Sequence, residues 1–416
     1  MPGPATSTET ERPSLRSRLR PFVTLLVVSF PLWYTGLILR GGKGLLDHSP
    51  IDQHTRQAQA WLAGRIDLPD APEYLEIASY GGRFFVSFPP VPSLVEVPLV
   101  VVFGEKTPNA LFGIYLFWLL ALASQFVIMR RCGWDERSAV LASLAFVFGT
   151  NLYASCVRAN VWAYGQSLGY CLAMIGLLFV TENLSRTRFA GGGYLFLALA
   201  VGCRPLLAML FPLFLALDHR TSQRSLARAL RSAVFWAGPV ALALASYNYA
   251  RFSNPLEFGH NHLAWAKALP DGIFSLAHVP WNAAHAFWSL PELHAEWPYL
   301  RFDTAGTAFF FNNAIFVVGL VGLCRARIDP WIRASAAFAL LTISLGVLCY
   351  EGKGNTQLGF RYVIDLLPVG FVALALAYRR FTWGMAAAAV FSTALNLYGL
   401  AVWKGLHAPS FSPEDR

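Results

Sequence analysis

The chain has 416 residues, of which 55% are hydrophobic and only 14% are charged, and its mean hydropathy is +0.45. Soluble domains carry about a quarter of charged residues, so this composition excludes an ordinary soluble protein and indicates a polytopic membrane protein. The net charge of +9 does not indicate nucleic-acid binding, because the basic residues stand at the ends of apolar runs and not on one polar face.

The chain begins with a polar tail and continues as one long series of apolar runs. Residues 1–20 are rich in Pro, Ser and Arg, which predicts a disordered cytoplasmic tail. Residues 21–403 predict a single transmembrane domain, and 404–416 predict a short tail on the outer side. Runs long enough to cross about 30 Å of hydrocarbon lie at 21–39, 109–129, 137–154, 162–181, 231–249, 306–323, 331–350, 361–378 and 383–403.

The apolar run 191–217 has arginines at both ends, which by the positive-inside rule places both ends in the cytoplasm. A single crossing cannot satisfy this rule. Arg204 and Pro205 interrupt the middle of the run, where a helix would break. We therefore expect two short half-spans that meet at Arg204 near the outer face, and about eleven crossings in all.

This topology leaves two large outer loops, 40–108 and 250–305. In the first loop, the run from Ile51 to Arg65 predicts an amphipathic helix that has Asp52 in its first turn and stops at Gly64. Residues 80–90 predict a hairpin. Residues 92–103 are too short to span the membrane comfortably, which favours an interfacial helix that carries Glu96.

The outer segments supply a candidate base. Asp52 would be an ionised carboxylate that faces the outer aqueous side, because a helix N-terminus favours negative charge. The same position is equally typical of a purely structural helix acid, and Asp47 is the alternative base. Five histidines in the second loop have spacings that match no compact metal site.

The same segments supply cations that could hold a phosphate beside Asp52. These candidates are Arg204, Arg361, Arg83 and Arg251. For Arg204 the alternative is a structural ion pair, and for Arg361 it is snorkelling at the end of a span. The further candidates for lining the cavity are His54, Tyr80, Tyr247, Asn248, Glu257, Gln357 and Tyr362.

Several short motifs extend along nearly the whole chain. They are Ala63-Gly64-Arg65, Tyr80-Gly81-Gly82-Arg83, Ser87-Phe88-Pro89-Pro90, Arg204-Pro205, Tyr247-Asn248, Arg251-Phe252, Asn254-Pro255 and Gly359-Phe360-Arg361-Tyr362. Together with an acid after the first span, this pattern resembles GT-C fold glycosyltransferases, in particular bacterial relatives of the protein O-mannosyltransferase and aminoarabinose transferase group (family 39-like).

The resemblance implies an all-α polytopic membrane protein, a GT-C-like bundle of about 11 transmembrane helices with outer-face loops that form the active-site cavity. It implies a polyprenyl-phosphate-linked sugar donor, a glycan, lipid or protein acceptor, and Asp52 as the general base of an inverting transfer. The expected location is a bacterial inner membrane, with the site on the periplasmic side.

Two departures from the family pattern affect these expectations. Many relatives have a second acid directly after the first, where this chain has Gln53, so no cofactor is certain and a divalent metal has no support. Several relatives have a Lys before the Pro-Pro pair, where this chain has Phe88, so phosphate binding falls to Arg83, Arg204 or Arg361.

Two other functions compete with transfer. A transporter or lipid flippase predicts broken helices in matching halves, whereas the single break at Arg204 has no evident partner. A non-catalytic subunit of a polysaccharide-assembly machine is the third hypothesis. The sequence does not identify the sugar or the acceptor.

Overall fold

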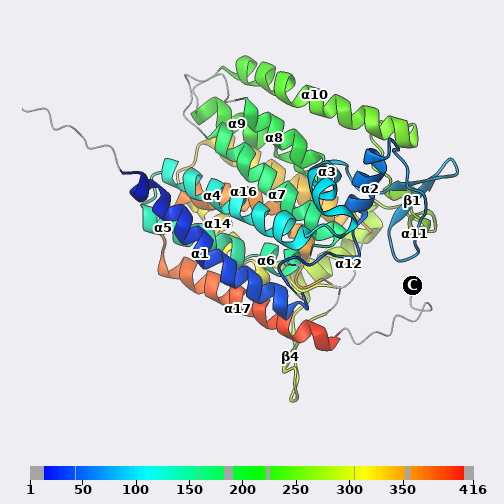
Figure 1. Ribbon diagram of the computed structural model, residues 1–416. Helices are drawn as coiled ribbons and strands as arrows, with labels where there is room; N and C mark the ends of the chain where they lie inside the picture. Colours follow the sequence, from blue (N-terminus) through cyan, green and yellow to red (C-terminus); the bar gives the residue numbers. More distant parts are fainter. Residues whose placement is uncertain are drawn as a thin grey trace, which may run out of the picture.

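The computed structural model describes residues 14–42, 44–157, 159–181, 191–221, 225–303, 305–351 and 357–406. These residues form a helical bundle with two small antiparallel hairpins (Figure 1). The first half contains α1 (Leu15–Leu39), α2 (Gln53–Leu62), β1 (Ile77–Tyr80), β2 (Arg83–Val86), α3 (Val91–Phe103), η1 (Gly104–Lys106), η2 (Ala110–Tyr115), α4 (Leu116–Arg131), α5 (Glu136–Phe148), α6 (Asn151–Cys156) and α7 (Val161–Val180).

The second half begins with the interrupted run at α8 and ends with the C-terminal helix α17. Its elements are α8 (Gly192–Val201), η3 (Pro205–Leu210), α9 (Phe211–Thr221), α10 (Leu226–Phe252), η4 (His260–His262), α11 (Ala264–Lys267), η5 (Leu276–His278), α12 (Val279–Ala283), η6 (Ala284–Trp288), β3 (Glu292–Leu293), β4 (Leu300–Arg301), α13 (Phe309–Asn312), α14 (Ala314–Arg325), α15 (Pro330–Leu348), η7 (Arg361–Leu366), α16 (Leu367–Ala377) and α17 (Trp383–Leu406).

Within the described residues, six helical stretches are long and apolar enough to cross a membrane. They are Leu15–Leu39, Ala110–Arg131, Val161–Val180, Leu226–Phe252, Pro330–Leu348 and Trp383–Val402. The other predicted spans are also helical but shorter or interrupted, because a break follows Phe148 and the run from Arg361 begins with a 3-10 turn. The protein is therefore an all-α integral membrane protein, and the count of eleven crossings stays a prediction.

The helices differ greatly in how much of their surface the protein covers. In the most apolar 18-residue window of α7, 83% of residues are buried inside the protein, against 11% for α10. Figure 1 shows α10 along one edge of the bundle and α1 beside α17 along the opposite edge. The apolar side chains that α10 exposes, such as Val234, Phe235 and Leu242, are suited to a lipid environment.

The predicted break at Arg204 is confirmed. α8 ends at Val201 and η3 begins at Pro205. The hydroxyl of Tyr194, near the start of α8, donates a 3.0 Å hydrogen bond to Asp218, near the end of α9. The chain therefore turns back at Arg204 as a helical hairpin, and the two ends of the run lie together, which agrees with the prediction that both are on the same side.

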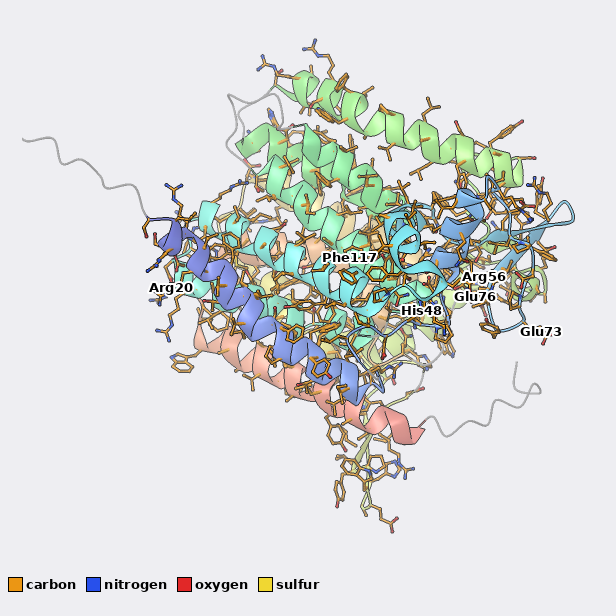
Figure 2. All side chains as sticks on the ribbon, in the orientation of Figure 1. Arg20, His48, Arg56, Glu73, Glu76 and Phe117 are labelled. Carbon is orange, nitrogen blue, oxygen red and sulfur yellow. The ribbon has the colours of Figure 1, made fainter. Side chains whose placement is uncertain are left out.

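The first loop folds at one end of the bundle. α2 ends as predicted, since Gly64 follows it with a φ of 70°, which only glycine adopts without strain. The predicted hairpin is β1 paired with β2, and its turn residues Gly81 and Gly82 have φ values of 58° and 74°. Figure 2 shows His48, Arg56 and Glu76 at this end and Arg20 at the opposite end.

Candidate active site

Asp52 is the N-cap residue of α2, and its carboxylate is fully hydrogen-bonded. One oxygen, Oδ1, accepts from the backbone N–H groups of His54 (3.0 Å) and Thr55 (3.2 Å). The other, Oδ2, accepts from the Thr55 hydroxyl and from the Asn109 amide (2.8 Å for the latter). Four donors occupy the roughly four lone-pair positions of a carboxylate, so the hydrogen-bonding capacity of Asp52 is filled within the protein.

The expectation that Asp52 lies in the first helical turn and faces the outer water is wrong. Its side chain precedes the first turn and is only 5% exposed. The sequence could not show this burial, because it arises when α3 and the segment around Asn109 fold over the start of α2. Asp52 is consequently held rigidly beneath the surface.

A cleft of about 250 Å³ is separated from Asp52 by Asn109, which lines it. It is bordered by the C-terminal end of α1, by residues 47–50 and by Asn109, whose amide also holds Asp52. Asp47, the alternative base, lines this cleft. Asp47 therefore lines the cleft itself, whereas Asn109 stands between Asp52 and the open space.

The start of α7 packs against Asp52 from the other side. The N–H of Val161 donates to the carbonyl of Ile51 (2.9 Å), the residue before Asp52. The Nε2–H of His54 donates to the Val161 carbonyl (3.3 Å), and its Nδ1 pairs with the Ser93 hydroxyl (3.2 Å). Burial lowers the pKa of His54 to about 4, so this histidine is neutral and acts as a bridge between α2, α3 and α7.

Trp162, the next residue along α7, lies against the cation of Arg361. Trp162 donates its indole N–H to Glu76 (2.9 Å), and its ring lies 5.4 Å from the guanidinium of Arg361. The ring of Tyr362 lies 5.3 Å from the same guanidinium. No described residue accepts a hydrogen bond from this guanidinium, and its Nε is buried without a partner. Arg361 is thus positioned by aromatic rings and has donors to spare.

Burial raises the pKa of Glu76, against the opposing effects of the Trp162 hydrogen bond and the nearby Arg361.

Gln357 fixes the backbone of Arg361, since its side-chain oxygen accepts from the Arg361 N–H (2.9 Å). The amide of Gln357 also donates to Ala305 (2.7 Å), which ties this position to the second outer loop.

Arg204 lies in the same region but is already engaged. Its guanidinium forms a forked ion pair with Asp365, with N to O distances of 2.8 to 3.2 Å. Close to Arg204 is His260, whose pKa is lowered to about 4 by burial and by the charge of Arg204. The ring of His260 packs on Phe88 (5.3 Å) and Tyr350 (6.4 Å). Phe88 in turn packs on His54 (6.0 Å), which connects the arginine region with the Asp52 region.

Arg251 and Arg83 have other roles. Arg251 is 2% exposed, donates to the Val86 carbonyl (2.7 Å) and to Asn248 (2.8 Å), and lies 4.3 Å from the Tyr247 ring. It therefore anchors the hairpin to the end of α10. Arg83 is on the exposed hairpin, where its hydrogen bond and that of Arg65 hold the pKa of Asp67 well below its usual range. The structure does not bring either arginine to Arg361.

The other predicted cavity residues divide between these regions. Tyr247 accepts from the Trp61 indole (3.2 Å), and Asn248 donates to the Pro255 carbonyl (3.2 Å). Tyr80 packs on His262 (4.7 Å), and Glu257 accepts from the Gly259 N–H. These four residues stabilise the outer loops, whereas His54, Gln357 and Tyr362 lie in the connected region around Asp52 and Arg361.

Sequence reasoning did not single out four residues that complete this region: Glu76, Asn109, Trp162 and Asp365. None belongs to a motif, and each is identified only by its spatial partner. Glu96 was noted, and it is buried close enough to Asp52 for the negative charge of Asp52 to act on it. Among the described residues, no group of three or more His, Cys, Asp or Glu side chains could hold a metal ion.

The fold and this arrangement define a polytopic membrane protein with the GT-C fold. Among solved structures, ArnT from Cupriavidus metallidurans bound to undecaprenyl phosphate is similar over 88% of this chain, with a TM-score of 0.51 and 12% sequence identity. Archaeal AglB, an oligosaccharyltransferase from Archaeoglobus fulgidus in complex with an inhibitory peptide and a dolichol-phosphate, is similar over 93% of this chain, with a TM-score of 0.45 and 13% identity.

The chain spans about 60% of the length of ArnT and 56% of that of AglB. No protein-family model matches the chain, and no curated protein matches it significantly. The likeness to ArnT, at 12% identity, therefore establishes the fold, which confirms the resemblance read from the short motifs.

Proposed function

We propose that this protein is a membrane glycosyltransferase that moves a sugar from a polyprenyl-phosphate donor to an acceptor hydroxyl, with inversion. The observation that carries the proposal is the pairing of a buried, fully hydrogen-bonded Asp52 with an uncommitted Arg361 on either side of the α7 N-terminus. The fold adds support, because it is that of ArnT, which binds undecaprenyl phosphate.

In this proposal each group has one task. An acceptor hydroxyl enters the cleft, takes the place of the Asn109 amide at Oδ2 of Asp52, and gives its proton to the carboxylate. The acceptor oxygen attacks the anomeric carbon from the face opposite the phosphate. The bond between that carbon and the phosphate oxygen breaks, and the guanidinium of Arg361 neutralises the departing phosphate.

Arg361 is a better candidate for the phosphate than the three other arginines. Binding a phosphate through Arg204 would require Asp365 to release it, and Arg251 would have to leave Val86 and Asn248. The proposed orientation places this end of the bundle on the periplasmic face of a bacterial inner membrane and the N-terminus in the cytoplasm. The acceptor, whether a glycan, a lipid or a protein, is left open.

The test compares envelope glycans and lipid carriers, by mass spectrometry, from cells with and without the protein. The donor found in this way is then supplied to purified protein, and release of free polyprenyl phosphate is measured. A flippase leaves the bond between sugar and phosphate intact, and an assembly subunit breaks no bond alone, so intact donor in every case would overturn the proposal.

Two asparagine variants assign the base. Asp52→Asn keeps the bonds to the His54 and Thr55 N–H groups but cannot take a proton, so turnover should fall by about two to four orders of magnitude. Asp47→Asn, in the same cleft, is the matched control. A well-folded Asp52→Asn protein with near wild-type turnover would exclude Asp52, and loss of turnover in Asp47→Asn alone would assign the role to Asp47.

A further inference from the structure

A second carboxylate lies next to Asp52, and its surroundings are the reverse of those of Asp52. Glu96 is on α3 and is 0% exposed. Ser93, three residues earlier, lies on the same face of the helix and contacts His54 on α2. Glu96 therefore points toward the start of α2, where the negative charge of Asp52 acts on it.

The two carboxylates differ in hydrogen bonding. Asp52 accepts four hydrogen bonds, whereas neither oxygen of Glu96 has a hydrogen-bond partner of good geometry in the part of the chain that the structure describes. Hydroxyls of Thr107 and Tyr164 lie beside Glu96. Thr107 also pairs with the Thr55 hydroxyl (3.2 Å), which donates to Asp52. A line of hydroxyls therefore joins the two acids.

Among the described residues, no cation compensates Glu96. Tyr164 faces it from α7, and its buried hydroxyl interacts with Glu96 without the geometry of a good hydrogen bond. His54 on α2 is neutral, as described above, and the charged residues of η1, Glu105 and Lys106, are exposed. A buried carboxylate without a counter-ion favours its neutral form, and the two hydroxyls beside Glu96 offset this only in part.

We propose that Asp52 and Glu96 act as one acid pair with a single negative charge, in which Glu96 holds the proton and keeps Asp52 ionised as the base. Glu96 is thus a positioning residue that acts through Asp52 and does not touch substrate. This role deepens the proposed function and depends on it. Burial, together with the charge of Asp52, raises the pKa of Glu96 to about 8.

The sign of the pH effect follows from this arrangement. Below pH 8 the pair carries one charge. As the pH rises through about 8, Glu96 ionises and places a second negative charge beside Asp52. That charge repels an anionic donor phosphate, so kcat/KM should fall on the alkaline side.

The first experiment needs no enzymatic activity. The infrared stretching band of a protonated carboxylic acid is titrated in the purified full-length protein across pH 8. We expect a band that disappears with a midpoint near 8, that is missing in Glu96→Gln and that persists in Glu105→Gln, the exposed control. In Asp52→Asn the midpoint should move to lower pH, because a neighbouring negative charge is gone. An unchanged band in Glu96→Gln, or an unchanged midpoint in Asp52→Asn, would overturn the proposal.

The second experiment measures kcat/KM against pH, each variant relative to its own maximum. The alkaline decrease should disappear in Glu96→Gln and remain in Glu105→Gln. The same decrease in both variants would refute the role of Glu96 while leaving the transferase proposal intact. Absence of donor cleavage in the wild-type protein at every pH would instead refute the transferase proposal. The infrared titration would still test the protonation of Glu96, because it does not depend on activity.

Discussion

Replacing Arg361 by Ala tests whether its unused donors serve a phosphate. The guanidinium lies 5.4 Å from the Trp162 ring and 5.3 Å from the Tyr362 ring, and no described side chain accepts a hydrogen bond from it. The substitution therefore removes no strong bond within the protein. Any loss of affinity for the donor reports the lost contact with the phosphate.

The size of the effect follows from one charge-assisted hydrogen bond. Such a bond contributes about 1.5 to 3 kcal/mol, so the Kd for polyprenyl phosphate should rise roughly 10- to 150-fold. Arg361→Lys should recover only part of the affinity, because an ammonium lacks the planar fork that matches phosphate. Binding to the detergent-solubilised protein can be measured by native mass spectrometry.

Arg83→Ala is the matched control for this experiment. It makes the same change in charge on the same end of the protein, but Arg83 is exposed and pairs with Asp67. We expect its Kd to stay close to that of the wild-type protein. Equal Kd values for Arg361→Ala and the wild type, or equal losses in Arg361→Ala and Arg83→Ala, would refute the assignment of Arg361 to the phosphate.

Two further predictions concern stability and are checked by thermal unfolding in detergent. Asp365→Ala leaves the guanidinium of Arg204 without its partner and should destabilise the protein by about 3 kcal/mol. This is the lower end of the range for a buried ion pair, because the Arg204 side chain keeps 24% exposure. Unchanged stability would mean that the pair does not stabilise the fold. Gly319→Ala puts a methyl group 2.6 Å from the Gly370 carbonyl between α14 and α16 and should cost about 1 to 3 kcal/mol, whereas Gly238→Ala on α10 meets nothing within 4 Å. Equal melting temperatures for the two glycine variants would contradict this packing argument.

Much of the fold could be predicted because a bilayer constrains local sequence strongly. A backbone in hydrocarbon must satisfy its hydrogen bonds within a helix, so long apolar runs identify spans directly. The break at Arg204 could be predicted for the same reason, since proline and a charged residue cannot continue an apolar helix in a bilayer. In the structure, α8 and α9 do turn back there. The end of α2 at Gly64 and the hairpin turn at Gly81-Gly82 could be predicted because the positive φ values that these positions need favour glycine.

The site was only partly predictable from the sequence. Asp52 and Arg361 were chosen by position and motif, but the sequence suggested an exposed Asp52, and it favoured Arg204 and Arg361 together for the phosphate, with Arg83 and Arg251 behind them. The ion pair of Arg204 with Asp365 and the contacts of Arg251 with Val86 join residues more than 150 positions apart. No local periodicity records such contacts, so only the folded chain separates a committed arginine from a free one.

The sequence by itself therefore determined the class of protein and most of its helices, because these depend on hydrophobicity and local backbone preference. Only the tertiary structure decided which carboxylate is surrounded by donors of good geometry and which is not. Asp52 receives them from Thr55 and from the distant Asn109, whereas Glu96, on a helix that packs against it, is buried without any of good geometry among the described residues. The difference in ionisation follows from these surroundings, since both side chains are ordinary carboxylic acids in water.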